Sequence, residues 1–379
     1  MTGLDGRRVY LDWNATAPLR PEARAAMLEA MDILGNPSSV HTEGRAARGV
    51  VEKAREQVSS LSGCDADEVA FTSGATEAAA IALSSKEAVF TSATDHDCVW
   101  LHANHSTFHA TDSDGVVRLG DAFDFEILPT LMQHDVVALP TANSETGSIN
   151  SLRHNVSYLR ERLPGGVEIF VDAAQAAGKT TWLFCEDAPD LASVSAHKLG
   201  GPKGVGALLV RTGVNVATPM LGGGQEQGRR SGTENVVGIA GFGAAAVAAK
   251  RDLEAGVWDR VEKLRNILEE GLEAAAPDLI IFGREASRLP NTSCFAVPGW
   301  KGETQVMQLD LAGFAVSAGS ACSSGKVKES RVLRAMGFDS LTASSAIRVS
   351  LGPTTTEAEI RAFLAAWTEL YRKRARRAA

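Results

Sequence analysis

The chain has 379 residues, of which 44% are hydrophobic and 22% are charged. This composition predicts a folded globular protein with enough apolar material for a core, and it excludes disorder, a collagen-like repeat and low complexity as the dominant state. The net charge of −8 argues against a basic surface that binds nucleic acid in bulk.

The cysteines are few, odd in number and far apart along the chain. They are Cys64, Cys98, Cys185, Cys294 and Cys322, and no two of them form a CxxC pair. This spacing disfavours a disulfide framework and a cysteine-based zinc or redox motif. We therefore expect mostly packing residues in a reduced protein, with one thiol as a candidate for reactivity.

The chain shows no targeting or membrane signal. Its first ten residues contain no apolar run, and no segment approaches the roughly 18 consecutive apolar residues of a transmembrane helix. The predicted location is the cytoplasm, and no membrane partner is expected.

The first 250 residues alternate short apolar runs with helical patterns. Helices are predicted at 21–31, 43–61, 77–83 and 152–163. Strands are predicted at 68–72, 88–92, 136–140, 167–171, 191–195 and 206–210. Several of these runs are apolar throughout, as in strands that are buried on both faces. The alternation is typical of a doubly wound α/β domain.

The pattern changes after Gly232. Residues 235–274 are predicted to be mostly helical, with only Gly256 and Gly271 as interruptions. Short runs at 279–282 and 292–297 follow, and a final helix extends from 356 to the region of residue 375. We expect a smaller α+β domain made of residues 1–12 and 251–379, beside a large domain at 13–250.

Five basic residues lie near the end of the chain: Arg372, Lys373, Arg374, Arg376 and Arg377. Cations at the end of a helix complement its dipole, and this interpretation is favoured because charge runs are usually solvated. A docking patch for an acidic partner is the alternative.

Three polar segments follow predicted strands, where α/β sheets place their ligands. Residues 72–77 offer small side chains and hydroxyls that suit an anion at a helix start, although a simple N-cap has the same pattern. Asp172 needs a cation or donors, such as a pyridinium nitrogen, unless it is solvated. Lys198 lies among glycines and small residues, which suits a Schiff-base lysine beside a planar ligand. A glycine-rich turn with a surface lysine is the alternative.

Three further features are candidates for chemistry. The glycine-rich loop at 221–235 carries arginines that suit a phosphate, or it is a linker. Cys322 lies in a run of Ser, Ala and Gly next to two lysines, which would lower the pKa of its thiol. Arg348 interrupts an apolar run, so it needs either a substrate carboxylate or an acidic residue of its own chain.

Histidines supply one better and one weaker candidate. His102, His105 and His109 have helical spacing, but no carboxylate or cysteine is patterned with them, so no metal site is predicted. His96 follows a predicted strand directly and is the better functional candidate.

Taken together, these segments resemble the cysteine desulfurases, within the class V aminotransferase group of pyridoxal-phosphate enzymes. The matching segments occur in order over nearly the whole chain: 10–12, 14–16, 35–39, 72–77, His96, 143–147, 172–175, 197–198, 230–233, 320–322 and Arg348. The resemblance implies PLP fold type I, the α/β fold of aspartate aminotransferase, with a large, mostly parallel sheet domain and a smaller α+β domain.

The resemblance implies pyridoxal 5'-phosphate (PLP) as the cofactor. Lys198 would bind it covalently, Asp172 would pair with the ring nitrogen, and Gln175 would donate to the phenolate oxygen. His96 would stack on the ring and assist proton transfer. The phosphate positions are matched by Ala75, Thr76, Ser195, His197 and Thr233. The family supplies the residue at Thr233 from the other subunit, which implies a homodimer.

The resemblance also implies a substrate site. Arg348, with Asn36 and Asn143, would bind the substrate carboxylate. The usual Asn-Asn-Glu motif of the family is Asn143-Ser144-Glu145 here, so Ser144 replaces an amide expected near the cofactor. Its hydroxyl has a shorter reach than that amide.

The implied reaction converts L-cysteine to L-alanine. Lys198 would move the Cα proton, and the thiolate of Cys322 would attack the substrate sulfur and keep it as a persulfide. The sulfur would pass to an acceptor protein, such as an iron–sulfur scaffold or a thiolation protein. The alternatives are a selenocysteine lyase, another class V aminotransferase, and a non-catalytic sulfur-relay scaffold.

Overall fold

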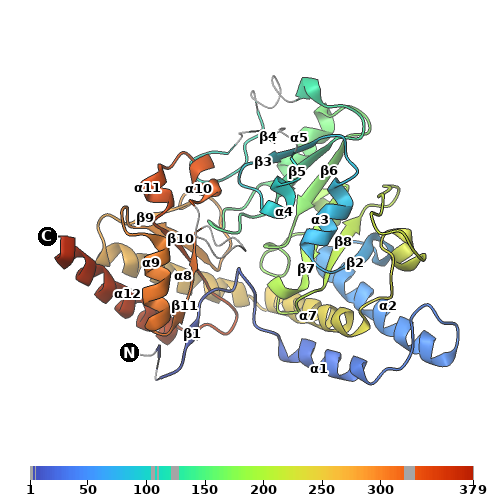
Figure 1. The fold of residues 1–379 in the computed structure, drawn as a ribbon, viewed down its shortest axis with the longest axis horizontal. Helices are drawn as coiled ribbons and strands as arrows, with labels where there is room; N and C mark the ends of the chain where they lie inside the picture. Colours follow the sequence, from blue (N-terminus) through green and yellow to red (C-terminus); the bar gives the residue numbers. More distant parts are fainter. Residues whose placement is uncertain are drawn as a thin grey trace.

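The computed structural model describes residues 3–4, 6–103, 107–108, 111–120, 128–319 and 329–378. Cys322, His105 and His109 lie outside these residues, and so does the lysine-flanked run around Cys322. Figure 1 shows a large sheet with helices on both sides and a smaller group of strands and helices that also contains the N-terminus.

The large sheet has seven strands in the order β2-β8-β7-β6-β5-β3-β4. Only β8 runs antiparallel to its neighbours β2 and β7, so the predicted, mostly parallel sheet is confirmed. The strands are β2 (Val69–Thr72), β3 (Val89–Ser92), β4 (Thr107–Phe108), β5 (Val136–Pro140), β6 (Glu168–Asp172), β7 (Leu191–Ser195) and β8 (Gly206–Val210).

Helices cover both faces of this sheet, which explains the apolar strands. Along β5, Val137 and Leu139 belong to one hydrophobic cluster, and Val136 and Ala138 belong to another. Successive side chains of a strand point to opposite faces, so each strand needs apolar residues on both. The helices are α1 (Pro21–Met31), α2 (Thr42–Ser62), α3 (Ala75–Leu83), α4 (Asp97–Trp100), α5 (Leu152–Arg162), α6 (Phe184–Asp187) and α7 (Val236–Glu254).

The smaller unit is built around a four-stranded antiparallel sheet in the order β12-β13-β10-β9. Its strands are β9 (Ile280–Ile281), β10 (Thr292–Ala296), β12 (Ser317–Ala318) and β13 (Ala346–Ser350). A separate pair joins β1 (Val9–Tyr10) to β11 (Phe314–Ala315) in parallel. Its helices are α8 (Val257–Ala275), α9 (Gly302–Leu311), α10 (Arg331–Ala335), α11 (Ser340–Ala343) and α12 (Glu357–Ala378).

Short 3-10 helices complete the described elements: η1 (Ala66–Glu68), η3 (Leu128–Thr130), η4 (Ala196–Lys198) and η5 (Gln225–Gly228). Residue 68, predicted to begin a strand, therefore ends η1 instead. No helix in the described residues is both long and apolar enough to cross a membrane.

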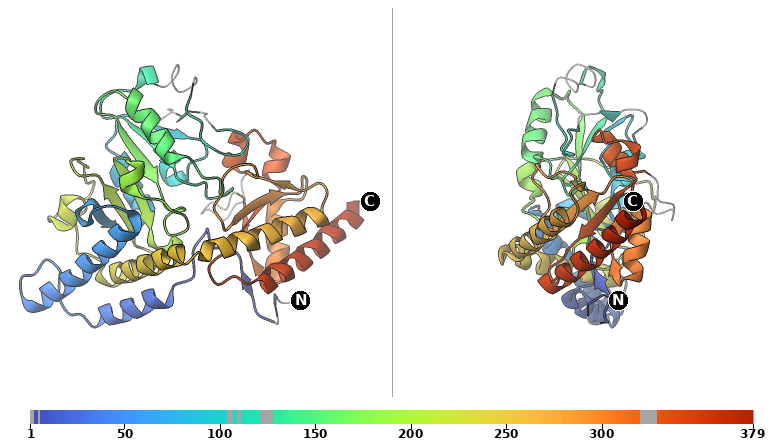
Figure 2. Two further views of the ribbon diagram at one scale, coloured as in Figure 1. Left: turned by 180° about the vertical axis from the view of Figure 1, so that it is seen from behind. Right: turned by 90° about the vertical axis from the view of Figure 1, so that its left-hand side faces the viewer.

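The predicted helical region at 235–274 is two helices. Gly256 has a φ of +67°, a left-handed conformation that favours glycine, and it separates α7 from α8. Gly271 does not interrupt α8, and a Cβ at this position would lie 2.5 Å from the Leu364 side chain of α12. That glycine instead permits the close packing of α8 on α12, which Figure 2 shows side by side.

Two hydrophobic cores support the two-part organisation. One core lies between the large sheet and α2, α5 and α7, and another joins α8, α9, α12 and the small sheet. Val9 and Leu11 belong to the second core, and Leu253 packs against both. We propose on this basis the division into 13–250 and 1–12 plus 251–379.

Candidate active site

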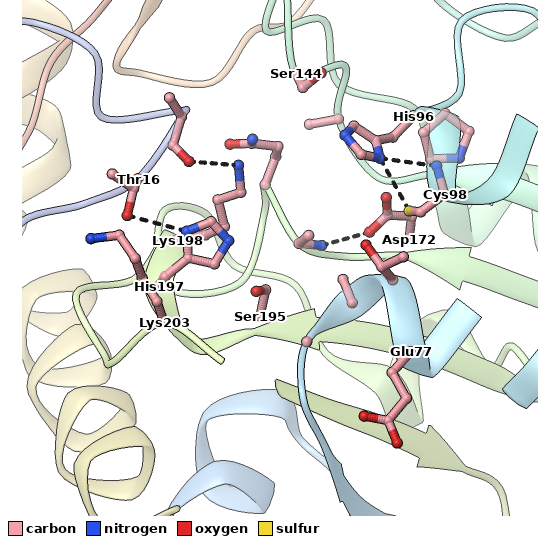
Figure 3. Close-up of a pocket in the computed structure, with 18 of the residues that line it drawn as sticks. Thr16, Glu77, His96, Cys98, Ser144, Asp172, Ser195, His197, Lys198 and Lys203 are labelled. Atoms are coloured by element: carbon pink, nitrogen blue, oxygen red, sulfur yellow. Dashed lines mark hydrogen bonds between the residues drawn. The ribbon is translucent and has the colours of Figure 1, made fainter. Parts of the chain in front are cut away.

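A cavity of about 560 Å³ lies at the carboxyl ends of three neighbouring strands. Pro140, Asp172 and Ser195, which end β5, β6 and β7, all line it. This edge is where open α/β sheets bind their ligands. Ten predicted site residues meet here: Ala75, Thr76, His96, Asn143, Ser144, Asp172, Gln175, Ser195, His197 and Lys198. Figure 3 shows Lys198 and His197 on one side, and His96, Cys98 and Asp172 on the other.

Lys198 ends the short helix η4, directly after β7. Its Nζ donates to the carbonyl oxygens of Asn14 at 2.6 Å and Ala15 at 3.1 Å. Burial, assisted by the charge of Arg348, lowers the pKa of Lys198 to about 8, although Asp172 acts in the opposite direction. The side chain is therefore free amine in a much larger fraction near neutral pH than an ordinary lysine, as a nucleophilic lysine requires.

Asp172 is held by two donors on one oxygen. Its Oδ1 accepts from the backbone N–H of Ala174 and from the Ser193 hydroxyl, both at 3.0 Å. Among the described residues, the hydrogen bonds of this carboxylate end on Oδ1, which leaves Oδ2 for a cationic group in the cavity. A ring nitrogen that carries a proton fits this position.

Other groups that line the cavity suit an anion. Ala75 and Thr76 begin the nine-residue helix α3, whose N-terminal N–H groups and dipole favour negative charge, and Lys203 adds a cation. Burial and the charges of Lys198 and Lys203 lower the pKa of His197 to about 4. A neutral His197 therefore lines the same wall, with Nδ1 located 3.2 Å from the Thr16 hydroxyl.

His96 caps the first turn of α4. Its Nδ1 accepts from the backbone N–H of Cys98 at 3.2 Å and lies 3.1 Å from the Cys98 sulfur. A backbone N–H can only donate, so Nδ1 is the unprotonated nitrogen and the ring proton is on Nε2. Burial, with Asp172 and Asp95, raises the pKa of the Cys98 thiol far above its ordinary value. Cys98 is thus a protonated thiol on the cavity wall.

Arg348 lies on β13 and is 6% exposed. Its guanidinium donates to Asp12 Oδ1 at 2.8 Å and to the Ser144 carbonyl at 2.9 Å. Its Nε is buried and has no hydrogen-bond partner among the described residues. The structure therefore shows Arg348 paired with an acidic residue of its own chain, Asp12. A role of Arg348 in binding the substrate carboxylate is a prediction.

Asn143 and Ser144 form part of the wall above the sheet edge. The Asn143 side chain donates to the Thr94 carbonyl at 2.9 Å and accepts the backbone N–H groups of Glu145 and Thr146. Both ends of this amide are therefore engaged by backbone, which shapes the loop. The Ser144 side chain lines the cavity without the reach of an amide.

Asn36 and Thr233 do not line this cavity. Asn36 lies in the turn between α1 and α2, where its side chain accepts the backbone N–H of Ser38 at 2.9 Å. Thr233 lines a smaller cavity of about 170 Å³ with Arg230 and Glu234. Arg230, from the loop expected to suit a phosphate, pairs with Glu77 at 3.1 Å instead.

Sequence reasoning missed three cavity or near-cavity residues. Cys98 is expected to be a packing thiol but lines the cavity, and its position two residues after His96 is a usable signal. Lys203 could have been recognised from its glycine-rich segment. Asn14, whose carbonyl holds Lys198, belongs to the matching segment 14–16, but its contact with Lys198 depends on how the N-terminal segment packs on the site.

Comparison with known proteins identifies the family. Residues 9–363 match the family model described as aminotransferase class-V, and the chain belongs to that family. A cysteine desulfurase of Cereibacter sphaeroides is 41% identical over 369 residues, which cover 93% of each chain. A cysteine desulfurase of Trichormus azollae is 37% identical, over 93% of this chain and 90% of its own.

Solved structures agree with this placement. A NifS-like protein from Rickettsia africae superimposes with a TM-score of 0.88 and 29% identity, over 96% of this chain and 99% of its own. Another NifS-like protein gives 0.86 and 33%, with the same coverage. Within its family, the chain groups with the cysteine desulfurases. The resemblance inferred from the sequence, PLP fold type I and the kind of enzyme are thereby confirmed.

Proposed function

We propose that this enzyme transfers the sulfur of L-cysteine to Cys322 as a persulfide and releases L-alanine. The observation that carries the proposal is the pairing of Lys198, whose pKa is lowered to about 8, with Asp172 in one cavity of a chain that is 41% identical to a cysteine desulfurase. Cys322 lies outside the described residues, and its role rests on the family resemblance.

The cavity residues fit PLP. Lys198 offers a free amine, Asp172 offers an open carboxylate oxygen, and the N-terminus of α3 with Lys203 and His197 offers an anion site. When bound, PLP supplies an electron sink that weakens the bonds to the substrate Cα. Gln175 would hold the phenolate side, and Ser144 would line the ring without the amide usual in the family.

The chain's own residues then handle protons and charge. The free amine of Lys198 accepts the Cα proton, and the carbonyls of Asn14 and Ala15 stabilise the ammonium that results. His96 lines the cavity, and since its Nδ1 accepts from the Cys98 backbone, Nε2 is the nitrogen that can donate. Arg348 would engage the substrate carboxylate through Nε, which has no other partner among the described residues.

The sulfur transfer is balanced between two thiols. The Cys322 thiolate attacks the sulfur of L-cysteine, so that an S–S bond forms as the substrate C–S bond breaks. The electron pair of that bond stays with the carbon, which takes a proton to become the methyl group of L-alanine. The outer sulfur then passes to an acceptor as the S–S bond breaks and the Cys322 thiolate leaves, and we propose that the acceptor is a cytoplasmic protein such as an iron–sulfur scaffold or a thiolation protein.

The central experiment incubates the purified protein with PLP and L-cysteine. We expect L-alanine in solution and an added sulfur on Cys322, located by mass spectrometry. Cys322→Ala should abolish sulfide release while keeping the cofactor band in the absorption spectrum. Undiminished sulfide release from Cys322→Ala would refute the persulfide role.

Two arms of that experiment address the alternatives. A selenocysteine lyase or another class V aminotransferase would turn over its own substrate in the Cys322→Ala variant, with L-selenocysteine as the first to be tried. A non-catalytic scaffold would show no cofactor band, so Lys198→Ala would leave its spectrum unchanged. For a desulfurase, Lys198→Ala removes the covalent cofactor band.

A further inference from the structure

Lys179 is a buried lysine that the mechanism above does not use. It lies seven residues after the end of β6 and is only 3% exposed. Its Nζ donates to Gln175 Oε1 at 2.7 Å and to Asn14 Oδ1 at 3.0 Å. Both partners are uncharged amides, and among the described residues no carboxylate pairs with it. Burial, assisted by Lys198 and Arg348, lowers the pKa of Lys179 far below its ordinary value.

Burying a lysine without a counter-ion costs folding free energy, because the amine loses its solvation. Hydrogen bonds in the interior are needed to offset this loss. An uncharged amine carries two N–H donors, and the structure offers two amide oxygens to receive them. The contact therefore satisfies the lysine and both oxygens together. It also determines which end of each amide faces Nζ, since the two ends of an amide have opposite hydrogen-bonding roles.

The consequence for Gln175 reaches the active site. With Oε1 on Lys179, its Nε2 turns toward the Asn14 carbonyl at 3.1 Å, and Gln175 lines the main cavity. A flipped amide would set its oxygen against that carbonyl oxygen, which is repulsive. The same carbonyl accepts from Lys198 at 2.6 Å. Lys179 thus contacts Gln175, which lines the cavity, and the side chain of Asn14, whose backbone carbonyl accepts from Lys198, without lining the cavity itself.

Asn14 is locked from its other side as well. Its Oδ1 also accepts from Asn291 at 3.0 Å, and its Nδ2 donates to the Thr292 hydroxyl at 2.8 Å. Asn14 and Asn291 are 1% and 0% exposed, so these bonds are shielded from water. The network joins the N-terminal segment, the turn after β6 and the start of β10.

We propose that Lys179 is a positioning residue that holds Gln175 with its NH2 group toward the cofactor cavity. In this role it would orient the donor that meets the phenolate oxygen of PLP. The proposal rests on the proposed function for its cofactor, but the network itself is a property of the chain without PLP.

Two variants test it. Lys179→Met removes both donors and keeps an unbranched side chain, while Lys179→Gln keeps N–H donors on a shorter stem. PLP is titrated into each apoprotein, and the dissociation constant and the absorption maximum are recorded. We expect Lys179→Met to bind PLP about tenfold more weakly, as for loss of one hydrogen bond to a charged group, with a shifted band. Lys179→Gln should fall between it and the wild type.

Gln175→Ala separates positioning from simple structural support. If Lys179 acts through Gln175, adding Lys179→Met to Gln175→Ala should change neither the band nor the affinity further. A full tenfold effect in that background, or a wild-type band and affinity in Lys179→Met alone, would overturn the proposal. If Lys179→Met does not fold, the same cycle is run with Lys179→Gln, and the same two outcomes decide it.

A cofactor-free cycle distinguishes this inference from the proposed function. Urea unfolding of the apoproteins of the wild type, the two single variants and the double variant measures the coupling between Lys179 and Gln175. If Lys179 and Gln175 are coupled but the wild-type protein binds no PLP, the contact between them is supported and the proposed function is refuted. If the wild type binds PLP but the coupling between Lys179 and Gln175 is zero, only the positioning role of Lys179 is refuted.

Discussion

The reactivity of Lys198 follows both from its position in the sequence and from its surroundings in the fold. Its glycine-rich segment suggested a nucleophilic amine, and its lowered pKa has an identifiable physical cause. Burial and the nearby Arg348 guanidinium destabilise the ammonium form, while Asp172 partly restores it. The amine therefore titrates close to neutral pH, where an ordinary lysine is fully protonated.

This titration predicts how the apoprotein captures PLP. Only the free amine reacts with an aldehyde, so the capture rate should rise with pH through about 8 and level off above it. Arg348→Met removes a positive charge, which raises the pKa of Lys198 and moves the midpoint to higher pH. Stopped-flow absorbance across a pH series measures both curves. A midpoint that stays in place or moves to lower pH in the variant would contradict the assignment.

The cysteines differ in reactivity for reasons that can also be tested. The thiolate is the reactive form, and burial keeps the pKa of Cys98 and that of the fully buried Cys294 well above the ordinary value. At neutral pH, iodoacetamide should therefore label the exposed Cys185 before either of them. Peptide mass spectrometry of a time course gives the order. Early labelling of Cys98 would show that its thiol ionises more readily than its surroundings imply.

At the scale of elements, α10 connects the smaller unit to the segment that carries His96. Arg331, the first residue of α10, donates to the carbonyls of Ala93 and Asp95 and to the Asp97 carboxylate. Its guanidinium lies 4.3 Å from the centre of the Trp100 ring. One side chain thus holds the connection between β3 and α4, including the backbone on both sides of Thr94.

Arg331→Met should loosen this connection because the carbonyls lose a charged donor while the stem packing is kept. We expect the unfolding free energy to fall by about 1.5–3 kcal/mol and amide exchange to accelerate across residues 93–100. Arg334→Met is the control on the same helix, because Arg334 contacts the Phe338 carbonyl and Glu329 outside residues 93–100, and its half-exposed pair with Glu329 is worth at most about 1 kcal/mol. Equal exchange in the two variants would refute the role of Arg331.

Two of the basic residues near the end of α12 make contacts within their own chain. Arg374 donates to the Pro298 carbonyl at 3.1 Å and lies over the Trp300 ring, and Lys373 pairs with Glu369 at 2.6 Å. These two cations are therefore engaged within their own chain. That engagement supports the interpretation as a helix end over the one as a docking patch.

At the scale of the whole molecule, three expected site residues among those that the structure describes do not line the cavity: Asn36, Thr233 and Arg348. We propose that the first two serve the cavity of a second copy of the chain in a homodimer. Asn36 and Thr233 lie outside the cavity of their own chain. Large apolar side chains are exposed near them, including Leu34 at 81%, Val40 at 88% and Leu221 at 93%. Exposed large apolar residues are a feature of protein interfaces, and we propose a second copy of the chain as the partner.

A mixing experiment tests the dimer. Lys198→Ala and Thr233→Ala chains are each expected to lack most desulfurase activity. If Thr233 serves the partner's cavity, a mixed dimer holds one cavity with both Lys198 and Thr233 intact, and activity should return. Co-refolded chains are assayed for L-alanine, with light scattering to confirm the dimer mass. No recovery from a confirmed mixed dimer would place Thr233 in the site of its own chain.

The sequence by itself determined where the strands lie along the chain and which residues stand at their ends. Apolar runs of about five residues predicted the buried strands, because a sheet covered on both faces needs apolar residues at every position. Asp172, Ser195 and Lys198 could be placed together in advance, since the carboxyl ends of parallel strands share one edge.

Only the tertiary structure decided the contacts between segments that are remote in sequence. Three contacts depend on which side chains face one another after packing: Arg348 with Asp12, Cys98 with His96, and Lys179 with Gln175. Local periodicity carries the period of a helix or strand but no information on its distant neighbours. Burial then shifts the pKa values of Lys198 and His197, because solvation is a property of the folded interior and not of the residue type.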